Sequence, residues 1–442
     1  MVRSVWLGIV LIGLGISTVG AQTREQKVRG DKAKVEAAGF WIYNDLARGL
    51  AEGKASGKPL LVVLRCVPCE ECVKLDDELI DHDEQLRPLL EKFVRVRLIS
   101  TNGLDLSLFQ FDTDQSFAVF LLNADGTIYG RFGTRSDRTE WVHDVSLEGL
   151  GQALEGALEL HQRYPQVKAQ LAAKRGGPPD FPVPESFPTL KGKYGPQLDY
   201  EGNVVRSCIH CHQIGDAQRE YYRSRGGAIP EQVLFPFPHP KAIGLTLNPR
   251  TRANVERVEP ATPAAQAGIA AGDEILELAG QPLLSIADIQ WVLHHASPEG
   301  ATLTAKVKRG AEERELSLVL PAGWRRRDDL SWRASSWGLR RFGLGGLYLR
   351  PLTAEERAER GVKDEPMALR VHHVGAFAPH DGAKRAGFLK DDIIVEFAGR
   401  RDLLRETDLL AYTLNQVPPG SAIPVKVVRG GKQLELQLPV SR

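Results

Sequence analysis

The sequence is poor in sulfur, because its 442 residues include only five cysteines and two methionines. So few cysteines cannot form the dense disulfide framework of small secreted domains. The formal net charge of +1 gives no indication of nucleic-acid binding. Charged residues at 26% and hydrophobic residues at 42% indicate folded domains and not a disordered chain. A chain of this length is expected to contain about three domains.

Long apolar runs are absent except at the N-terminus. Residues 4–23 carry no charge, follow Arg3 and include the small residues Val19-Gly20-Ala21. This pattern is typical of a secretory signal peptide, so we expect residues 1–21 to be cleaved and the protein to be periplasmic or otherwise exported. Glycines at positions 8, 13 and 15 interrupt the run, which favours cleavage over anchoring. Membrane attachment is expected only if this segment stays uncleaved.

The five cysteines form two tight clusters, Cys66-Cys69-Cys72 and Cys208-Cys211. Outside the cytoplasm, a thiol is oxidised, bound to a ligand or kept reduced for a purpose. Each cluster is therefore predicted to be a local chemical site.

The first cluster follows Leu60–Leu64, a short apolar run that predicts a buried central strand. Further strands are predicted at residues 93–98, 117–122 and 127–132, with a hairpin turn at residues 123–126. Helices are predicted over residues 31–56, after the cluster, and over 147–171. This order, with a cysteine pair after the first strand, resembles the thioredoxin fold and implies a thioredoxin-like α/β domain at residues 31–176.

In the first cluster, Cys66-Val67-Pro68-Cys69 opens a predicted helix. A helix N-terminus favours the thiolate, which is the form that attacks disulfides. We predict Cys66 and Cys69 as the redox couple and Cys72 as a third, resolving thiol. In the alternative couple, Cys69 with Cys72, the acidic residues Glu70 and Glu71 would raise a neighbouring thiol pKa. A structural disulfide with one further thiol, and a metal held by three thiolates, stay open.

The position opposite the cysteine pair differs from thioredoxins, which have a cis-proline there. In this chain the position falls at Ser116-Phe117 and holds no proline. The difference favours a domain that senses redox state or relays electrons over one that processes many substrates.

Residues 177–240 are predicted to be a proline-rich linker followed by a haem-attachment segment. Cys208-Ile209-His210-Cys211-His212 matches the c-type haem motif, in which two thiols bind the porphyrin and the next histidine binds the iron. We therefore predict c-type haem on Cys208, Cys211 and His212, and no nucleotide cofactor. His239 is a weak candidate for the sixth iron ligand. A plain disulfide, and a zinc site with His210 or His212, stay open.

The C-terminal half contains an internal repeat. Ala264–Ile275 resembles Ala383–Ile394, and Lys306–Gly310 recurs as Lys426–Gly430, in both cases about 120 residues later. Both copies resemble the α+β PDZ domains of bacterial exported proteins, with a glycine-containing strand start, an Ala-Gly helix end and a final strand that reaches Arg-Gly. The copies are assigned to residues 241–322 and 343–442. Asp391 stands where the first copy has Gly272, and we expect the turn to survive because Asp tolerates a left-handed backbone.

The PDZ resemblance implies a groove in which a peptide C-terminus adds to a strand edge beside a helix. The strand starts are Ile243-Gly244-Leu245 in the first copy and Gly346-Leu347 in the second. We therefore expect peptide or protein C-termini as partners, together with a periplasmic redox partner. Degenerate PDZ domains that serve only for packing are the alternative. The N-terminal half shows no serine nucleophile in a glycine-rich setting, so serine protease activity is not expected.

The basic connection at residues 323–342 interleaves tryptophan with six arginines, at positions 325, 326, 327, 333, 340 and 341. Anionic lipid or an acidic partner could bind such a segment. We expect instead a linker whose tryptophans pack on neighbouring domains while the arginines stay in solvent.

Taken together, the chain resembles a bacterial exported family that joins thioredoxin-like, haem-motif and tandem PDZ segments, some members of which place selenocysteine in the first cluster. The expected function is that of a periplasmic redox protein, by thiol exchange or haem electron transfer, recruited by its PDZ domains. A non-catalytic PDZ scaffold with structural cysteine clusters is the alternative.

Overall fold

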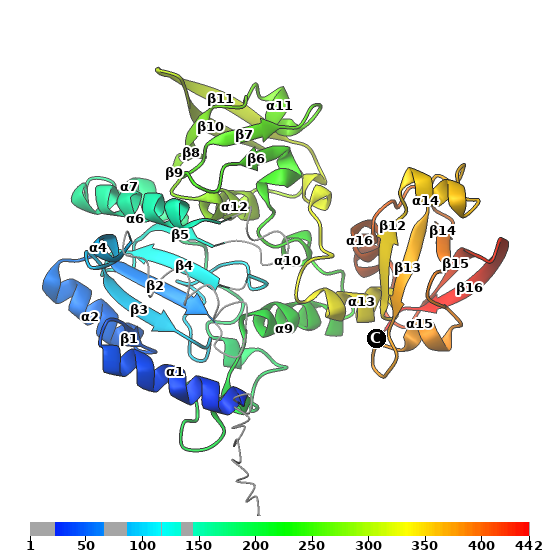
Figure 1. Cartoon of the computed structure of the whole chain (residues 1–442), viewed down its shortest axis with the longest axis horizontal. Helices are drawn as coiled ribbons and strands as arrows, with labels where there is room; N and C mark the ends of the chain where they lie inside the picture. The colour runs from blue at the N-terminus through cyan, green and yellow to red at the C-terminus, as the bar shows by residue number, and fades with distance from the viewer. Residues whose placement is uncertain (1–22, 66–85, 116, 134–144, 442) are drawn as a thin grey trace, which may run out of the picture.

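The computed structural model describes residues 23–65, 86–115, 117–133 and 145–441, arranged as three folded units (Figure 1). Residues 1–21 and the cluster Cys66, Cys69 and Cys72 lie outside the described residues. Within the described ranges, no helix combines the length and the apolar character needed to cross a bilayer.

The N-terminal unit is built on a five-stranded sheet with the order β1-β3-β2-β4-β5. β1, β2 and β3 run parallel, and β4 and β5 are antiparallel to their neighbours. The strands are β1 (Ile42–Tyr43), β2 (Leu60–Arg65), β3 (Val94–Leu98), β4 (Phe117–Leu122) and β5 (Ile128–Phe132). The helices are α1 (Arg24–Ala38), α2 (Leu46–Ser56), α4 (Arg87–Leu90), α6 (Leu147–Gln162) and α7 (Lys168–Leu171), with the short turn η1 (Ala172–Lys174). All three strands predicted after Leu60–Leu64 are confirmed.

Two of the predicted helices are wrong in extent. Residues 31–56 form not one helix but α1 and α2, because Gly39 ends α1 in a left-handed conformation and β1 follows. Asp45 then caps α2 by accepting the N–H of Arg48. Residues 147–171 are likewise divided into α6 and α7, with Pro165 in the gap, since proline cannot donate the hydrogen bond that a continuous helix requires.

Residues 177–240 form more than an extended linker, since they pack along one face of the N-terminal sheet. Alternate β2 side chains enter two cores, as a strand buried on both faces requires. Leu61 and Val63 pack towards α6. Leu60, Val62 and Leu64 share the other core with α2 and with apolar residues of this segment, namely Phe181, Phe187, Leu190, Ile209, Ile214 and Ala217. The segment contains η2 (Pro184–Ser186), α8 (Val204–Ser207), α9 (Cys211–Ser224) and α10 (Glu231–Leu234), and η3 (Pro240–Ile243) begins at its last residue.

The two C-terminal α+β units have similar orders of elements, but β9 is present only in the first and α14 only in the second. The first unit contains β6 (Leu245–Leu247), β7 (Val255–Val258), α11 (Pro263–Gln266), β8 (Glu274–Leu278), β9 (Gln281–Pro282), α12 (Ile286–His295), β10 (Ala301–Arg309) and β11 (Glu312–Leu320). The second contains β12 (Leu347–Pro351), α14 (Ala354–Glu359), β13 (Leu369–Val374), α15 (Gly382–Arg385), β14 (Ile393–Phe397), α16 (Glu406–Gln416), β15 (Ala422–Arg429) and β16 (Lys432–Pro439). Asp391 has φ 73° and Gly272 has φ 88°, which confirms that the turn survives the substitution.

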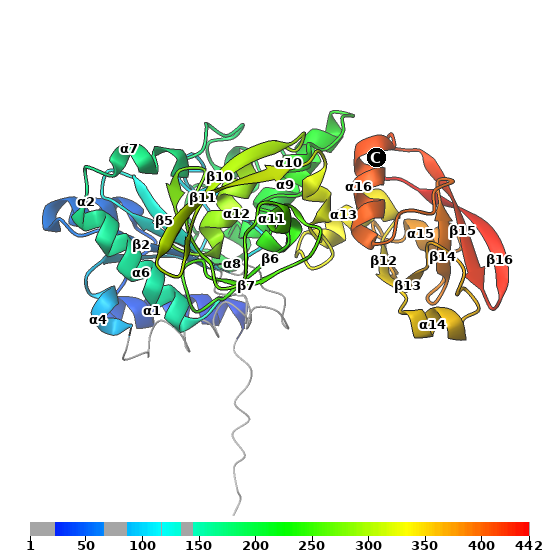
Figure 2. The same cartoon turned by 90° about the horizontal axis from the view of Figure 1, so that it is seen from above.

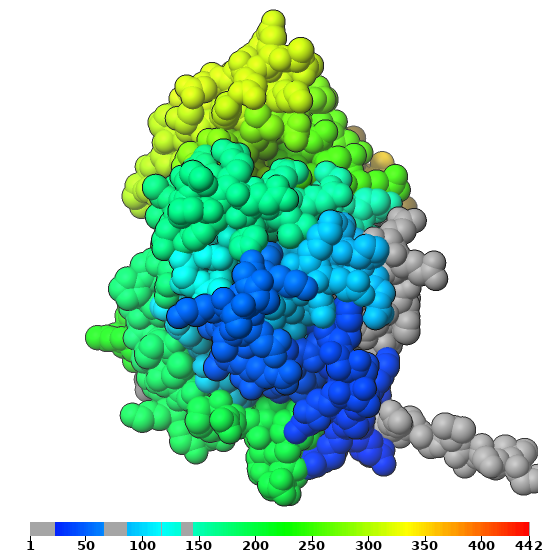
Figure 3. Space-filling view, turned by 90° about the vertical axis from the view of Figure 1, so that its left-hand side faces the viewer, coloured from blue at the N-terminus to red at the C-terminus, as the bar shows by residue number. Residues whose placement is uncertain are grey.

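The first α+β unit stacks on the N-terminal unit, while the second lies to one side (Figures 1 and 2). α12 packs against β5, and the space-filling view shows the first unit continuous with the N-terminal unit (Figure 3). The connection between the two α+β units carries η4 (Trp324–Arg327) and α13 (Ser336–Leu344).

Candidate functional sites

The second cysteine cluster lies between two helices. Asn203 caps α8 by accepting the N–H of Arg206, and Cys208 follows the end of this helix. His210 is the N-cap residue of α9, and its backbone N–H donates to Gln213. Cys211 is therefore the first residue of a 14-residue helix.

The loop after β3 fixes the backbone around Cys208. The N–H and the hydroxyl of Thr101 both donate to the carbonyl of Ile209, at 3.1 and 2.9 Å. The side chain of Asn102 donates to the carbonyl of Ser207 and accepts the N–H of Ile209, both at 2.8 Å. Since backbone and side-chain groups hold both flanks of Cys208, this residue cannot move without breaking several hydrogen bonds.

The two thiols of the cluster differ in exposure. Cys208 is only 6% exposed, and Cys211 is half-buried at the start of α9. Burial raises the pKa of the Cys208 thiol to about 11, although a hydrogen bond with Ser100 acts in the opposite direction. No disulfide joins Cys208 to Cys211.

The two histidines of the motif lie parallel to each other, with ring centroids 5.7 Å apart and an interplanar angle of 1°. His212 is exposed and His210 is half-buried. Burial lowers the pKa of His210, and the neighbouring His212 and Arg24 lower it further. A neutral imidazole at position 210 is the result at neutral pH.

The described residues around Cys208 do not fit a haem in this conformation. Among the described residues, the hollow beside the motif, lined by residues 64–65, 98–101 and 209–211, has essentially no room for even a water molecule. Pockets for drug-sized ligands hold about 300–1,000 Å³, and a porphyrin is at least of that size. His239, the weak candidate ligand, is not among the lining residues; it is buried and its Nδ1 accepts the N–H of Lys241. Haem attachment stays a prediction from the sequence.

The residues that line this hollow show that the second cysteine cluster lies beside the end of β2. Arg65, the last residue of β2, lines the hollow together with Cys211. The side chain of Arg65 is buried and paired with Asp31 at 2.7 Å. Cys66 is the next residue along the chain. The first cluster therefore follows β2 directly in the sequence, and Cys211 of the second cluster lies beside the carboxyl ends of β2 and β3, where open α/β sheets place their ligand sites.

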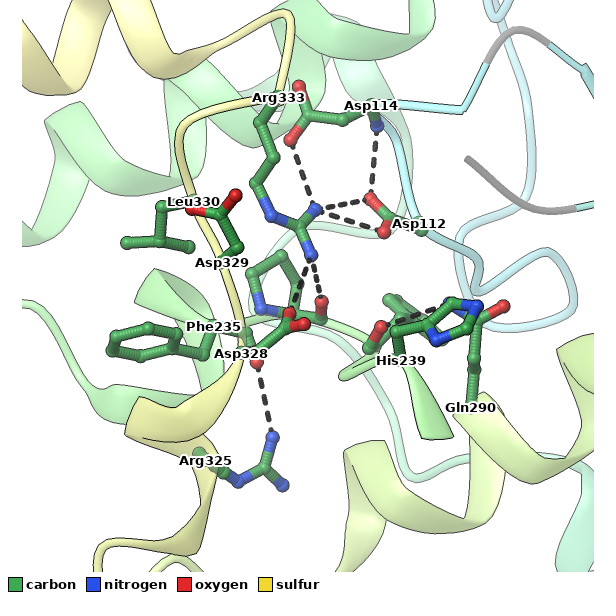
Figure 4. A network of polar contacts seen from close by, with 12 residues as sticks. Asp112, Asp114, Phe235, His239, Gln290, Arg325, Asp328, Asp329, Leu330 and Arg333 are labelled. Carbon is green, nitrogen blue, oxygen red and sulfur yellow. Dashed lines mark hydrogen bonds and ion pairs between the residues drawn. The ribbon is translucent and has the colours of Figure 1, made fainter. Parts of the chain in front are cut away.

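A buried ionic network joins the connection to the N-terminal unit (Figure 4). Nη1 of Arg333 lies 2.8 and 2.9 Å from the two carboxylate oxygens of Asp112 and 3.3 Å from Asp114. Arg219 of α9 reaches Asp114 at 3.4 Å, and Asp328 lies 3.6 Å from Nη2 of Arg333. Burial raises the pKa of Asp112 despite the charge of Arg333. Burial acts the same way on Asp114, but Arg219 and Arg333 outweigh it and hold its pKa below the usual range.

The prediction that the arginines of residues 323–342 stay in solvent is wrong for half of them. Arg325, Arg333 and Arg340 are buried. Arg325 donates to the carbonyls of Leu293 and Ala296 at the C-terminus of α12, at 3.0 and 2.7 Å. Buried carboxylates and helix-end carbonyls provide the partners that make burial of a guanidinium tolerable. The tryptophan prediction holds for Trp324, which is buried, and for Trp337, which is 44% exposed but contacts the rings of Tyr348 and His373 in the second α+β unit.

The predicted peptide-binding residues lie at equivalent places in the two α+β units. Gly244 has φ 87° and precedes β6, and a Cβ there would lie 2.1 Å from Oγ1 of Thr262. Gly346 has φ 88° and precedes β12, and a Cβ there would lie 1.8 Å from the carbonyl oxygen of His380. The side chains of Ile243, Leu245 and Leu347 are buried in the cores of their units. Only glycine satisfies both the backbone and the space at these two strand starts.

The helix of the first groove is held against the N-terminal unit. Nζ of Lys174 lies 2.8 Å from Asp288 of α12, and both side chains are buried. Trp291 donates its indole N–H to the carbonyl of Ala173 at 3.0 Å, and Arg131 of β5 lies over its ring at 3.7 Å. α12 is therefore a shared wall of the two units.

Comparison with known proteins identifies two of these units. A thioredoxin-like family model matches residues 41–124, and a PDZ domain model matches residues 241–320. The chain therefore contains a thioredoxin-like domain and a PDZ domain.

One curated relative and a group of solved structures are similar to part of the chain. A probable periplasmic serine endoprotease, DegP-like, of Halomonas elongata is 28% identical over 181 residues, which are 40% of this chain and 35% of that protein. The chain thus spans about a third of the length of this relative. HtrA-type protease AlgW with a tripeptide is 17% identical and covers 31% of this chain and 48% of that chain, with a TM-score of 0.20. The same protease with a decapeptide has the same identity and TM-score, over 31% of this chain and 41% of that chain. So low a TM-score supports no inference.

Proposed function

We propose that this chain is an exported redox protein that exchanges thiols and disulfides at the end of its thioredoxin-like sheet. Its PDZ domains recruit it to the C-termini of partner proteins. The observation that carries the redox part is that Cys211 lines one hollow with Arg65, the residue directly before Cys66, at the carboxyl ends of β2 and β3.

The chemistry proposed for the first cluster is ordinary thiol exchange. The thiolate of Cys66 attacks a disulfide sulfur of the partner, and a mixed disulfide forms while the leaving sulfur departs as a thiolate and takes up a proton. Cys69 or Cys72 then attacks the mixed disulfide and releases the reduced partner. The chain is left with an intramolecular disulfide.

For the second cluster, the arrangement supports thiol chemistry at Cys211 more than haem attachment. A half-buried thiol at the start of α9 lies where the N–H groups of a helix favour an anion. Attachment of a porphyrin would require Cys208 to leave its place beside Ser100, together with the backbone that Thr101 and Asn102 hold.

Export and peptide recruitment rest on separate observations. The uncharged N-terminal run is typical of a signal peptide, and the curated relative is described as periplasmic. The PDZ match at residues 241–320 supports peptide binding by the first unit. For the second unit, the support is the similar order of elements and the matching backbone at Gly244 and Gly346.

An insulin-reduction assay on the mature chain tests the redox part. We expect wild-type activity, loss in Cys66→Ser, and retained peptide binding in that variant. The non-catalytic scaffold predicts no reductase activity in either protein. Equal activity of Cys66→Ser and wild type would overturn the assignment of the first cluster.

Expression with a c-type haem maturation system tests the second cluster. We expect a colourless protein whose Cys208 and Cys211 peptides keep their unmodified masses. A covalent haem spectrum that vanishes in Cys208→Ala would instead establish haem attachment.

A further inference from the structure

Strand β12 lies at the edge of the five-stranded sheet of the second α+β unit. β13 pairs with one side of this strand, and α16 packs near it. A peptide that adds to such an edge must accept hydrogen bonds from the N–H groups that point away from β13. The availability of these groups therefore decides whether the groove can take a ligand.

One of these N–H groups already has an acceptor. The backbone N–H of Leu349 donates to Oε1 of Glu406 at 2.8 Å, in the buried space between β12 and α16. A carboxylate of the same chain thus stands where a carbonyl oxygen of an added strand would accept. The N–H of Gly346 also has an acceptor, the carbonyl of Arg340 at 2.9 Å, but this bond does not distinguish the two units, because the N–H of Gly244 likewise donates to the carbonyl of Lys241 at 3.0 Å.

Glu406 is held in this place by Arg340 of α13. The guanidinium contacts both carboxylate oxygens, with Nη2 2.7 Å from Oε2 and Nε 3.0 Å from Oε1, and both side chains are buried. Such a two-point pair fixes the carboxylate in direction as well as in distance. α13 itself is fixed, because it packs against α16 beside Leu410 and Leu414.

The first α+β unit has no such acceptor at the equivalent position. Glu406 is the first residue of α16, and the first residue of the equivalent helix α12 is Ile286. An isoleucine side chain cannot accept a hydrogen bond. The two units therefore differ in the chemistry of this position at the edge of the groove.

We propose that Glu406, held by Arg340, closes the groove of the second unit, so that the first unit alone takes peptide C-termini in the resting protein. The second groove opens when the Arg340–Glu406 pair is broken. This inference rests on the proposed peptide binding, which it refines by assigning the two units different roles.

Residue-resolved hydrogen exchange on the full mature chain tests the closure without a ligand. In Glu406→Ala, the Leu349 amide is expected to exchange about tenfold faster or more, because its acceptor is lost. Asp408→Ala is the matched control. It removes a carboxylate from the same turn of α16, but this carboxylate accepts the N–H groups of Leu404 and Arg405 and does not contact β12. An unchanged Leu349 rate in Glu406→Ala overturns the proposal.

Peptide binding is then followed by the same measurement. The probe is a set of decapeptides that differ only in the C-terminal residue, each compared with its amidated form. We expect the free-carboxylate peptides to protect the amides of residues 245–247 from exchange in wild type. The amides of residues 347–350 are expected to be protected only in Glu406→Ala, the opened variant. Equal protection of 347–350 in wild type overturns the closure, and so does the absence of protection there in the opened variant.

The same data separate the closure from the proposed function. If residues 245–247 gain no protection while 347–350 do so only in Glu406→Ala, peptide recruitment by the first unit fails and the closure stands. Because Glu406→Ala leaves Arg340 buried without its partner and could unfold the unit, Arg340→Met/Glu406→Ala serves as a second opened variant that removes both charges.

Discussion

Arg333 and Asp112 are 221 residues apart in the sequence, yet one nitrogen of Arg333 contacts both carboxylate oxygens of Asp112. Both side chains are almost fully buried. The pair joins the connection before the second α+β unit to the thioredoxin-like domain. The domains of this chain are therefore held together by buried charge and not only by a flexible tether.

Removal of Arg333 is expected to destabilise the protein strongly. Arg333→Met leaves Asp112 and Asp114 buried with less opposing charge, a situation that costs about 3–5 kcal/mol. Arg333→Lys is expected not to restore stability, since an ammonium group cannot reproduce the planar guanidinium contacts. The measurement is the free energy of unfolding in urea. The exposed neighbour Arg327 is the control, and Arg327→Met should stay within about 0.5 kcal/mol of wild type. A similarly small effect of Arg333→Met would contradict this account.

Two lysine ion pairs of equal length allow the effect of burial to be measured separately. Lys174–Asp288 and Lys168–Asp125 both have N–O distances of 2.8 Å, but the side chains are 0% and 1% exposed in the first pair and 57% and 38% in the second. We expect Lys174→Met to cost about 3–5 kcal/mol of unfolding free energy and Lys168→Met to cost far less, because its pair is exposed to solvent. Thermal and urea unfolding of both variants provide the comparison. Equal costs would show that α12 is not anchored by its buried charge.

Much of the fold could be predicted because the signals are local. The apolar run at Leu60–Leu64 indicated a central strand, and the repeat indicated two units with similar orders of elements. The buried arginines could not be predicted, since their partners lie far away in the sequence: Asp112 for Arg333 and Glu406 for Arg340. A run of basic residues predicts solvent exposure as long as its buried carboxylate partners are unknown.

The candidate site was predicted only in part for the same reason. The sequence identifies the two cysteine clusters but not that Cys208 packs beside the end of β3. The polar pair Thr101-Asn102 directly after a buried strand was a signal that could have indicated this docking. The apolar residues of 177–240 that complete the core are few and scattered, and only Ile214 and Ala217 in α9 have a helical spacing, so their burial left little pattern to recognise.

Gly244 is expected to be indispensable at the strand start of the PDZ domain. Gly244→Ala combines a left-handed backbone with a Cβ 2.1 Å from Oγ1 of Thr262, and we expect a cost of about 2 kcal/mol or more. Peptide binding should weaken in parallel. Gly268→Ala is the matched control, because its φ is +79° but nothing lies within 4 Å of the added Cβ, so about 1 kcal/mol is expected from the backbone alone. Equal costs of Gly244→Ala and Gly268→Ala would show that the chain moves Thr262 away from the added Cβ at no cost in stability.

His294 is expected to make stability depend on pH. Burial, followed by the charges of His295 and Arg325, lowers the pKa of His294 well below its ordinary value. As the pH falls, the unfolded chain therefore takes up a proton at position 294 before the folded chain does. The contribution of neutral His294 to the unfolding free energy is complete above about pH 6.5 and is lost as the pH falls below it. Its Nδ1 accepts the N–H of Phe237 at 3.2 Å. His294→Asn should reduce the slope of unfolding free energy between pH 7 and 5 by up to about 1.4 kcal/mol per pH unit. An unchanged slope would assign the dependence to other groups.

Alkylation should distinguish the two thiols of the second cluster. With a pKa of about 11, Cys208 is almost entirely protonated at pH 8, with a thiolate fraction of about 0.1%. We expect iodoacetamide to modify Cys211 first, and the rate at Cys208 to rise about tenfold per pH unit up to its pKa. Peptide mass mapping gives both rates in one sample, with Cys208→Ser as control. Equal rates at pH 8 would mean that Cys208 is not buried in the way that raises its pKa. Resistance of both thiols, together with an added porphyrin mass, would instead show that they are already consumed by haem.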